Sequence, residues 1–137
     1  MQTFVPYPDF AASAKVLDRL RLGKQRVEAY QILRAHLGFS KGWHQHPATL
    51  MWTGHLSGLA AYTLACCDEW VGRGYADTIR TKVTELVTPD HTDLPDWWGD
   101  PTVHLSHQSN LLRKMPDHYG QFFTDVPDDL PYVWPTT

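Results

Sequence analysis

Residues 21–33, RLGKQRVEAYQIL, decide the fold because they show the periodicity of a helix. Arg21, Lys24 and Glu28 recur at the i, i+3 and i+7 spacing that puts side chains on one stripe of a helix. Apolar residues spread around the rest of the circumference. We therefore expect a helix that is buried on most sides and open along one polar strip, where a single carboxylate stands among cations.

Helix-forming residues extend outward from this stretch, from about Ala11 to Leu37, and Gly38 is suited to end that helix. Gly23 is expected to kink or split it. Apolar residues at helical spacing predict a long core helix over 48–71, which Gly72 and Gly74 end. Shorter helices are predicted from Asp77, as the capping residue, to about Val87, and over 105–114; loops are expected at 40–47 and 88–101.

No strand pattern of any length is present, so the predicted fold class is all-α. We expect residues 1–137 to form a single compact domain of about three main helices, because a chain of this length can bury one core. An extended N-terminal arm precedes the helices, and an aromatic, proline-rich C-terminal tail follows them. We expect the protein to be a monomer.

The expected compartment is the cytoplasm. The only two cysteines, Cys66 and Cys67, are adjacent in sequence, so reduced thiols are predicted rather than a disulfide framework. No apolar run approaches the roughly 20 residues that a membrane span needs, and no signal-peptide pattern opens the chain. These features predict a protein without a membrane partner.

Charge is distributed unevenly along the chain. The formal net charge is −3, which argues against a nucleic-acid partner, but residues 1–44 carry seven basic and only three acidic side chains. A cationic N-terminal third can therefore face an anionic partner while the acidic remainder keeps the protein in solution.

The polar strip is the first candidate site. It could be an ordinary solvated face with charge pairs, but the local bases outnumber the acids too heavily for simple pairing. Glu28 is the only acid between Asp18 and Asp68, so neighbouring cations would keep it ionised. An ionised carboxylate among phosphate-binding cations can stabilise a developing positive charge or move a proton. The cations concerned are Arg19, Arg21, Lys24, Arg26 and Arg34.

Histidines form a second candidate site. His44, His46, His104 and His107 could hold a zinc ion if they converged, although neither His-x-His nor His-x-x-His at these positions belongs to a strong zinc motif.

The segment SHQSNLLRK, residues 106–114, is a third candidate site. Its residues could serve as helix caps and last-turn cations, or they could contact phosphates and base edges.

The order of motifs resembles the phage-type pyrimidine-dimer DNA glycosylases, also called the endonuclease V family of that type, and in particular its bacterial branch. The similarity includes the basic-plus-Glu helix LDRLRLGKQRVEAYQIL, the loop GWHQHP, the helix end EWVGRGYADT and the segment LSHQSNLLRKMPDHYGQF. The opening TF-x-PYP-x-F is typical of the bacterial branch. The resemblance extends over most of the chain.

The resemblance implies a compact, all-helical enzyme that works on damaged or modified duplex DNA without a metal or other cofactor. In this family the N-terminal α-amine forms a Schiff base with the sugar, and one glutamate assists both base removal and strand cleavage. Carried over by position, the catalytic residues are Met1 and Glu28. The DNA-binding residues are Arg19, Arg21, Lys24, Arg26, His46, His107, Asn110, Arg113 and Lys114.

Gln2 departs from the family pattern, in which a small second residue is exposed after methionine is removed. The bulk of Gln2 predicts that Met1 is retained and supplies the amine.

The sequence leaves three functions open: a DNA glycosylase with β-lyase activity, a DNA-binding module that has lost the chemistry, and a histidine-based metal-dependent hydrolase of nucleotides.

Overall fold

An extended arm, residues 1–9, leads into the helices of the computed structural model, which describes residues 1–135. Within this range no strand forms, so the predicted all-α fold is confirmed. The helices of the described part are α1 (Phe10–Val16), α2 (Arg19–His36), α3 (Pro47–Leu50), α4 (Leu56–Gly72), α5 (Ile79–Leu86), α6 (Pro101–Lys114) and α7 (Pro116–Tyr119).

The expected first helix is divided into α1 and α2, and the division lies at Leu17–Asp18 rather than at Gly23. Asp18 begins α2 by accepting a hydrogen bond from the Arg21 amide. Partners distant in sequence hold the interruption: the Tyr119 hydroxyl accepts from the Asp18 N–H at 3.0 Å, and the Arg73 guanidinium donates to the Leu17 carbonyl at 2.8 Å. The prediction of a break at Gly23 was therefore wrong.

Gly23 lies inside α2 because another helix approaches it closely. A Cβ atom at this position would lie 3.1 Å from the ring of Trp70 on α4. The glycine thus lets α2 and α4 pack together, which is a tertiary requirement that the local sequence does not reveal. Gly38 does follow the end of α2 with a φ of 81°, as predicted.

The prediction of one long helix over 48–71 was also wrong, because the chain forms α3 and α4 with a turn between them. Gly54 has a φ of 82° in this turn, a conformation that no right-handed helix contains. Pro47 begins α3, and α4 ends at Gly72, as predicted. Asp77 does cap the start of α5, since its carboxylate accepts from the Arg80 amide at 2.9 Å.

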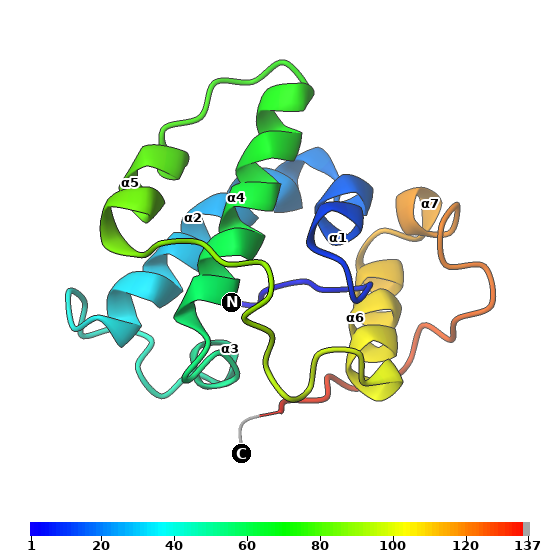
Figure 1. Cartoon of the computed structure of the whole chain (residues 1–137). Coiled ribbons are helices and arrows are strands. Elements are labelled where there is room, and N and C mark those ends of the chain that lie inside the picture. Colours follow the sequence, from blue (N-terminus) through cyan, green and yellow to red (C-terminus); the bar gives the residue numbers. More distant parts are fainter. Residues whose placement is uncertain (136–137) are drawn as a thin grey trace.

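Helix α4 forms the centre of the fold. It packs on α1, α2 and α5, and it runs across the middle of the molecule with α5 on one side and α1 on the other (Figure 1). Buried apolar residues from the arm to Phe123 form one hydrophobic cluster, which includes Trp52, Leu59, Tyr62 and Leu111. The N-terminal arm crosses the middle of this view (Figure 1), and its residues Gln2, Thr3 and Val5 are buried.

The described part of the C-terminal tail is irregular and forms a strap along α6. After α7 it turns back and passes along α6 (Figure 1). Two serines of α6 hold it there, because Ser109 Oγ accepts from the Leu130 N–H at 3.0 Å and Ser106 Oγ accepts from the Val133 N–H at 3.2 Å. Among residues 1–135, no helix is long and apolar enough to span a membrane.

Candidate active site

The N-terminal end of the arm and the polar strip of α2 form a pocket of about 390 Å³. Met1, Gln2 and Phe4 supply one wall of it. Lys114 from the end of α6 and Tyr132 from the tail complete the rim. The residues that α2 contributes are Leu20, Arg21, Lys24, Gln25 and Glu28. The stripe predicted at 21–28 thus faces the N-terminus of its own chain.

Gln25 fixes the arm against α2. Its amide Nε2 donates to the Gln2 carbonyl at 2.7 Å, and its Oε1 accepts from the Phe4 N–H at 2.8 Å. The side chain is buried, so water does not compete with either bond. No role was predicted for Gln25 from the sequence, although a side-chain amide can both donate and accept and is therefore suited to bridging backbone groups.

Glu28 lies one helical turn beyond Gln25 and is half-buried at the pocket wall. Within the described chain no cation forms a salt bridge with it, so the carboxylate is not committed to a structural ion pair. The pKa of His46 is lowered by burial and by the N-terminal amine, and Glu28 partly offsets this decrease. The amine and the Glu28 carboxylate therefore both lie within electrostatic reach of the same imidazole.

Three cations border the pocket. Lys24 and Lys114 are exposed, and neither forms a salt bridge in the part of the chain that the structure describes. Arg21 is half-buried and pairs with Asp18 at 3.0 Å. Arg19 is exposed on the first turn of α2 but does not line the pocket. The lysines are thus the cations most available to an anionic ligand.

Arg26, which was predicted to bind DNA, lies away from the pocket. Its guanidinium forms an ion pair with Asp77 and lies 4.5 Å from the centre of the Trp70 ring. Its side chain is only 12% exposed, and that of Asp77 is 3% exposed. This arrangement joins α2 to the start of α5 and leaves the guanidinium unavailable to a phosphate.

We expect Arg26→Ala to destabilise the fold by about 3 kcal/mol, because removal of one partner leaves a buried carboxylate unpaired. Although burial opposes it, hydrogen bonds from the Arg80 amide and from Arg26 hold the pKa of Asp77 below its ordinary value. Ionised Asp77 therefore stabilises the protein above about pH 4, and this contribution is lost as the pH falls through the lowered pKa.

Urea unfolding at several pH values measures both effects. The Arg26→Ala variant should lose stability at pH 7 and show a flatter acid dependence than the wild type. Arg80→Ala is a matched control, because its side-chain pair with Asp68 is largely exposed and should contribute less than about 1 kcal/mol. Equal stability losses in the two variants would contradict a structural role for Arg26.

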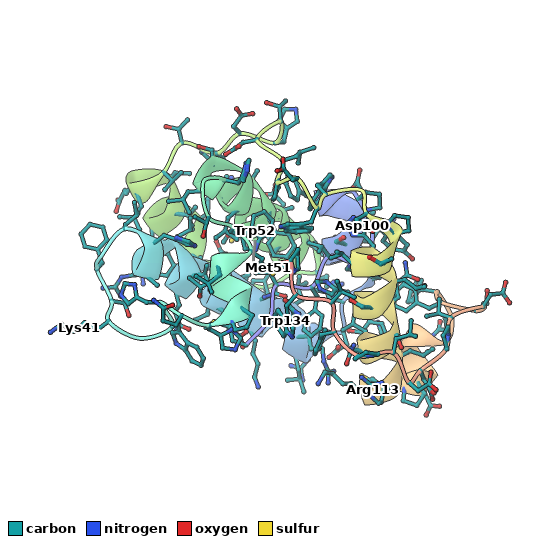
Figure 2. All side chains as sticks on the ribbon, turned by 90° about the horizontal axis from the view of Figure 1, so that it is seen from below. Lys41, Met51, Trp52, Asp100, Arg113 and Trp134 are labelled. Atoms are coloured by element: carbon teal, nitrogen blue, oxygen red, sulfur yellow. The ribbon has the colours of Figure 1, made fainter. Side chains whose placement is uncertain are left out.

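Three further residues predicted to bind DNA have partners within the described chain. His107 is fully buried, and its Nδ1 accepts from the Val5 N–H at 2.9 Å. Asn110 donates to the Leu130 carbonyl at 3.2 Å, and Arg113 donates to the Asp128 carbonyl at 2.6 Å, so both hold the tail. Arg113 lies at the far end of α6 from Asp100 (Figure 2). None of these residues lines the pocket.

His46 lies next to the pocket but has a structural role as well. Its Nδ1 accepts from the Ala48 N–H at 3.0 Å and thereby caps α3. Its ring packs edge-on against Trp43 and against Trp134 of the tail. Figure 2 shows Trp134 near the middle of the molecule when it is seen from below. His46 thus joins the tail to the loop before α3.

The histidine metal site is not assembled by the described residues. Across 1–135 there is no group of three or more His, Cys, Asp or Glu side chains that could hold a metal ion. His44 contacts the Ser40 carbonyl, whereas His104 and His107 bond to the arm. His104 and His107 therefore hold the arm, whereas His44 and His46 belong to the loop before α3.

Comparison with known families places the chain among the DNA glycosylases. It belongs to the pyrimidine dimer DNA glycosylase family, whose model matches residues 1–83. The matched part contains the arm, α1–α4 and the start of α5, and it includes every pocket residue except Lys114 and Tyr132. No curated protein and no solved structure gives a significant match.

Proposed function

We propose that the protein is a DNA glycosylase with β-lyase activity, which removes damaged or modified pyrimidines from duplex DNA through the α-amine of Met1. The observation that carries this proposal is the pocket itself. It brings the N-terminal residue together with Glu28, a carboxylate that has no salt bridge among residues 1–135, inside a border of cations. The family membership of the chain supports the same reaction class.

The reaction begins when the neutral α-amine attacks C1′ of the target deoxyribose. The bond from C1′ to the base breaks, and the base leaves with the bonding electron pair. An α-amine is suited to this step because its usual pKa of about 7.7–8.0 leaves an appreciable neutral fraction at physiological pH. The attacking nitrogen then gives up one proton, the bond from C1′ to the ring oxygen breaks, and that oxygen takes up a proton to become a hydroxyl. The product is a protonated Schiff base.

Glu28 acts at the two steps where charge or a proton must be handled. Its carboxylate stabilises the positive charge that develops on the sugar as the base leaves. It then accepts the C2′ proton, so that the 3′ phosphate leaves by β-elimination. Water hydrolyses the Schiff base and restores the free amine. Lys24 and Lys114 bind the flanking phosphates and hold C1′ near the amine.

Incubation of the protein with duplex oligonucleotides tests the proposal. The substrates carry a cyclobutane pyrimidine dimer, an abasic site or another modified pyrimidine, and the buffer contains excess EDTA. Strand cleavage at the lesion, leaving an unsaturated sugar at the new 3′ end, is the expected result. Salt-sensitive binding without cleavage of any substrate would instead favour a binding module, and activity lost in EDTA would favour a metal-dependent reaction.

The proposed phosphate contacts predict how DNA affinity depends on salt. Each cation that neutralises a phosphate adds about 0.9 to the slope of log affinity against log salt. Lys24→Ala is therefore expected to reduce the slope by about one unit and to weaken binding similarly for all sequences. Titrations of a fluorescent duplex at several salt concentrations measure the slope.

Lys82→Ala is the matched control for this experiment, because Lys82 is also exposed but lies on α5 and does not line the pocket. It should leave the slope unchanged. A slope that Lys24→Ala does not alter, or that both variants alter alike, would show that DNA does not lie over this pocket.

A further inference from the structure

Two histidines of α6 bind the backbone of a single residue in the N-terminal arm. His107 Nδ1 accepts from the Val5 N–H at 2.9 Å, and His104 Nδ1 bonds to the Val5 carbonyl at 2.7 Å. The two imidazoles are one helical turn apart and lie on the same side of α6. Both polar groups of one peptide residue are thus held by side chains of one helix.

The hydrogen bonds fix the protonation of both rings. The Gly99 N–H donates to His104 Nε2 at 2.9 Å, so His104 is neutral and carries its proton on Nδ1. His107 accepts at Nδ1 and therefore carries its proton on Nε2. Burial lowers the pKa of both imidazoles. The pKa of His107 falls to about 3, because repulsion from the charge that His104 carries when it is protonated adds to the effect of burial. Both rings therefore keep these bonds at physiological pH.

His107 is not explained by stability alone. Its Nε2 is buried and has no hydrogen-bond partner among the described residues. A buried N–H without a partner is unfavourable, whereas an apolar side chain of similar size would fill the same space without that cost. The imidazole is therefore better accounted for by the bond that its other nitrogen makes to the arm.

The residues of the arm on either side of Val5 are also held by hydrogen bonds to their backbone. The Tyr62 hydroxyl donates to the Phe4 carbonyl at 2.7 Å, and Gln108 Nε2 donates to the Pro6 carbonyl at 2.7 Å. Gln25 of α2 binds the backbone of Gln2 and Phe4 as well. The chain between Val5 and the pocket therefore has little freedom, and the position of Met1 depends on where Val5 is held.

We propose that His104 and His107 are positioning residues, which hold the arm so that the Met1 amine lies beside Glu28 in the pocket. This role rests on the proposed amine mechanism. A displacement of about 1 Å can cost roughly 100-fold in rate when the reacting groups must be aligned. The histidines predicted from sequence to contact DNA or a metal would then act through the nucleophile instead.

Paired substitutions separate positioning from simple packing. Asn places a polar atom where the imidazole has Nδ1, so His107→Asn and His104→Asn can keep the bond to Val5, whereas His107→Leu and His104→Leu cannot. We expect each Leu variant to lower kcat for cleavage of a lesion-containing duplex by about 100-fold, with less than about threefold change in KM. Each Asn variant should recover most of the lost kcat.

His118→Leu is the control for loss of stability. His118 is half-buried and is likewise bonded to a backbone carbonyl, that of Val16 at 2.8 Å, but among the described residues it forms no hydrogen bond with the arm. It should lose stability as the other Leu variants do and keep its kcat. Hydrogen exchange at the Val5 amide gives a readout independent of activity, and it should become faster in His107→Leu but not in His118→Leu.

The outcomes distinguish the two proposals. Wild-type protein that cleaves no lesion would refute the proposed function, even if the Val5 amide were protected from exchange. An active wild type whose His104→Leu and His107→Leu variants keep an undiminished kcat would overturn the positioning role. The same conclusion would follow if all three Leu variants, including His118→Leu, lost kcat equally, because the losses would then reflect stability.

Discussion

Replacement of Glu28 by Gln should lower the single-turnover rate of strand cleavage at least about 1,000-fold, with less than about threefold change in DNA affinity. Gln has nearly the same size, but it cannot carry the negative charge that stabilises the sugar cation, and it cannot accept the C2′ proton. Losses of about 100- to 10,000-fold are usual for either role. Rapid-quench cleavage of a lesion-containing duplex measures the rate, and titration of the same duplex measures the affinity.

Glu85→Gln provides a matched control, since Glu85 is an exposed carboxylate on α5 that lies outside the pocket. It removes the same charge from the protein and should leave the rate unchanged. A Glu28→Gln enzyme that retained a rate within tenfold of the wild type would show that the carboxylate in the pocket is not a catalytic group.

Blocking the α-amine of Met1 should abolish turnover and leave most of the DNA affinity. Acylation near pH 6.5 modifies the α-amine before the lysines, because the usual pKa of an α-amine is about 7.7–8.0 and that of a lysine about 10.4. Mass spectrometry confirms that only the N-terminal peptide is modified. The acylated nitrogen has no available electron pair for attack on C1′, so no Schiff base can form.

Two controls accompany this measurement. The protein taken through the same procedure without the acylating reagent should keep its full rate. Acylated protein should still bind a lesion-containing duplex with the salt dependence of the unmodified protein, because Lys24 and Lys114 are intact. Normal turnover by fully acylated protein would rule out the N-terminal amine as the nucleophile.

Local sequence was sufficient to predict the all-α fold class and the polar residues that α2 places on one face. Arg21, Lys24 and Glu28 share one face by spacing alone, and the structure places all three at the pocket. The same geometry accounts for Arg26, which is two residues from Lys24 and from Glu28 and so points to nearly the opposite side of α2. Its ion-pair partner Asp77, which precedes α5, lies 51 residues further along the chain.

The position of the helix break and the role of His107 depended on contacts between segments that are distant in sequence. The break at Leu17–Asp18 is held by Arg73 and Tyr119, whereas the glycine that marks a helix break in the sequence is used for close packing. The role of His107 could not be predicted because its partner, Val5, is 102 residues away. Local periodicity shows which residues share a face but not which segment covers that face.

Borohydride reduction tests the central claim most directly, because it converts a Schiff base between the protein and DNA into a stable secondary amine. The protein is incubated with a duplex containing an abasic site, reduced and digested, and the cross-linked peptide is sequenced by mass spectrometry. The account predicts one adduct per protein on the N-terminal peptide, at the nitrogen of Met1. An adduct at Lys24 or Lys114, or no adduct under conditions in which the strand is cleaved, would contradict it.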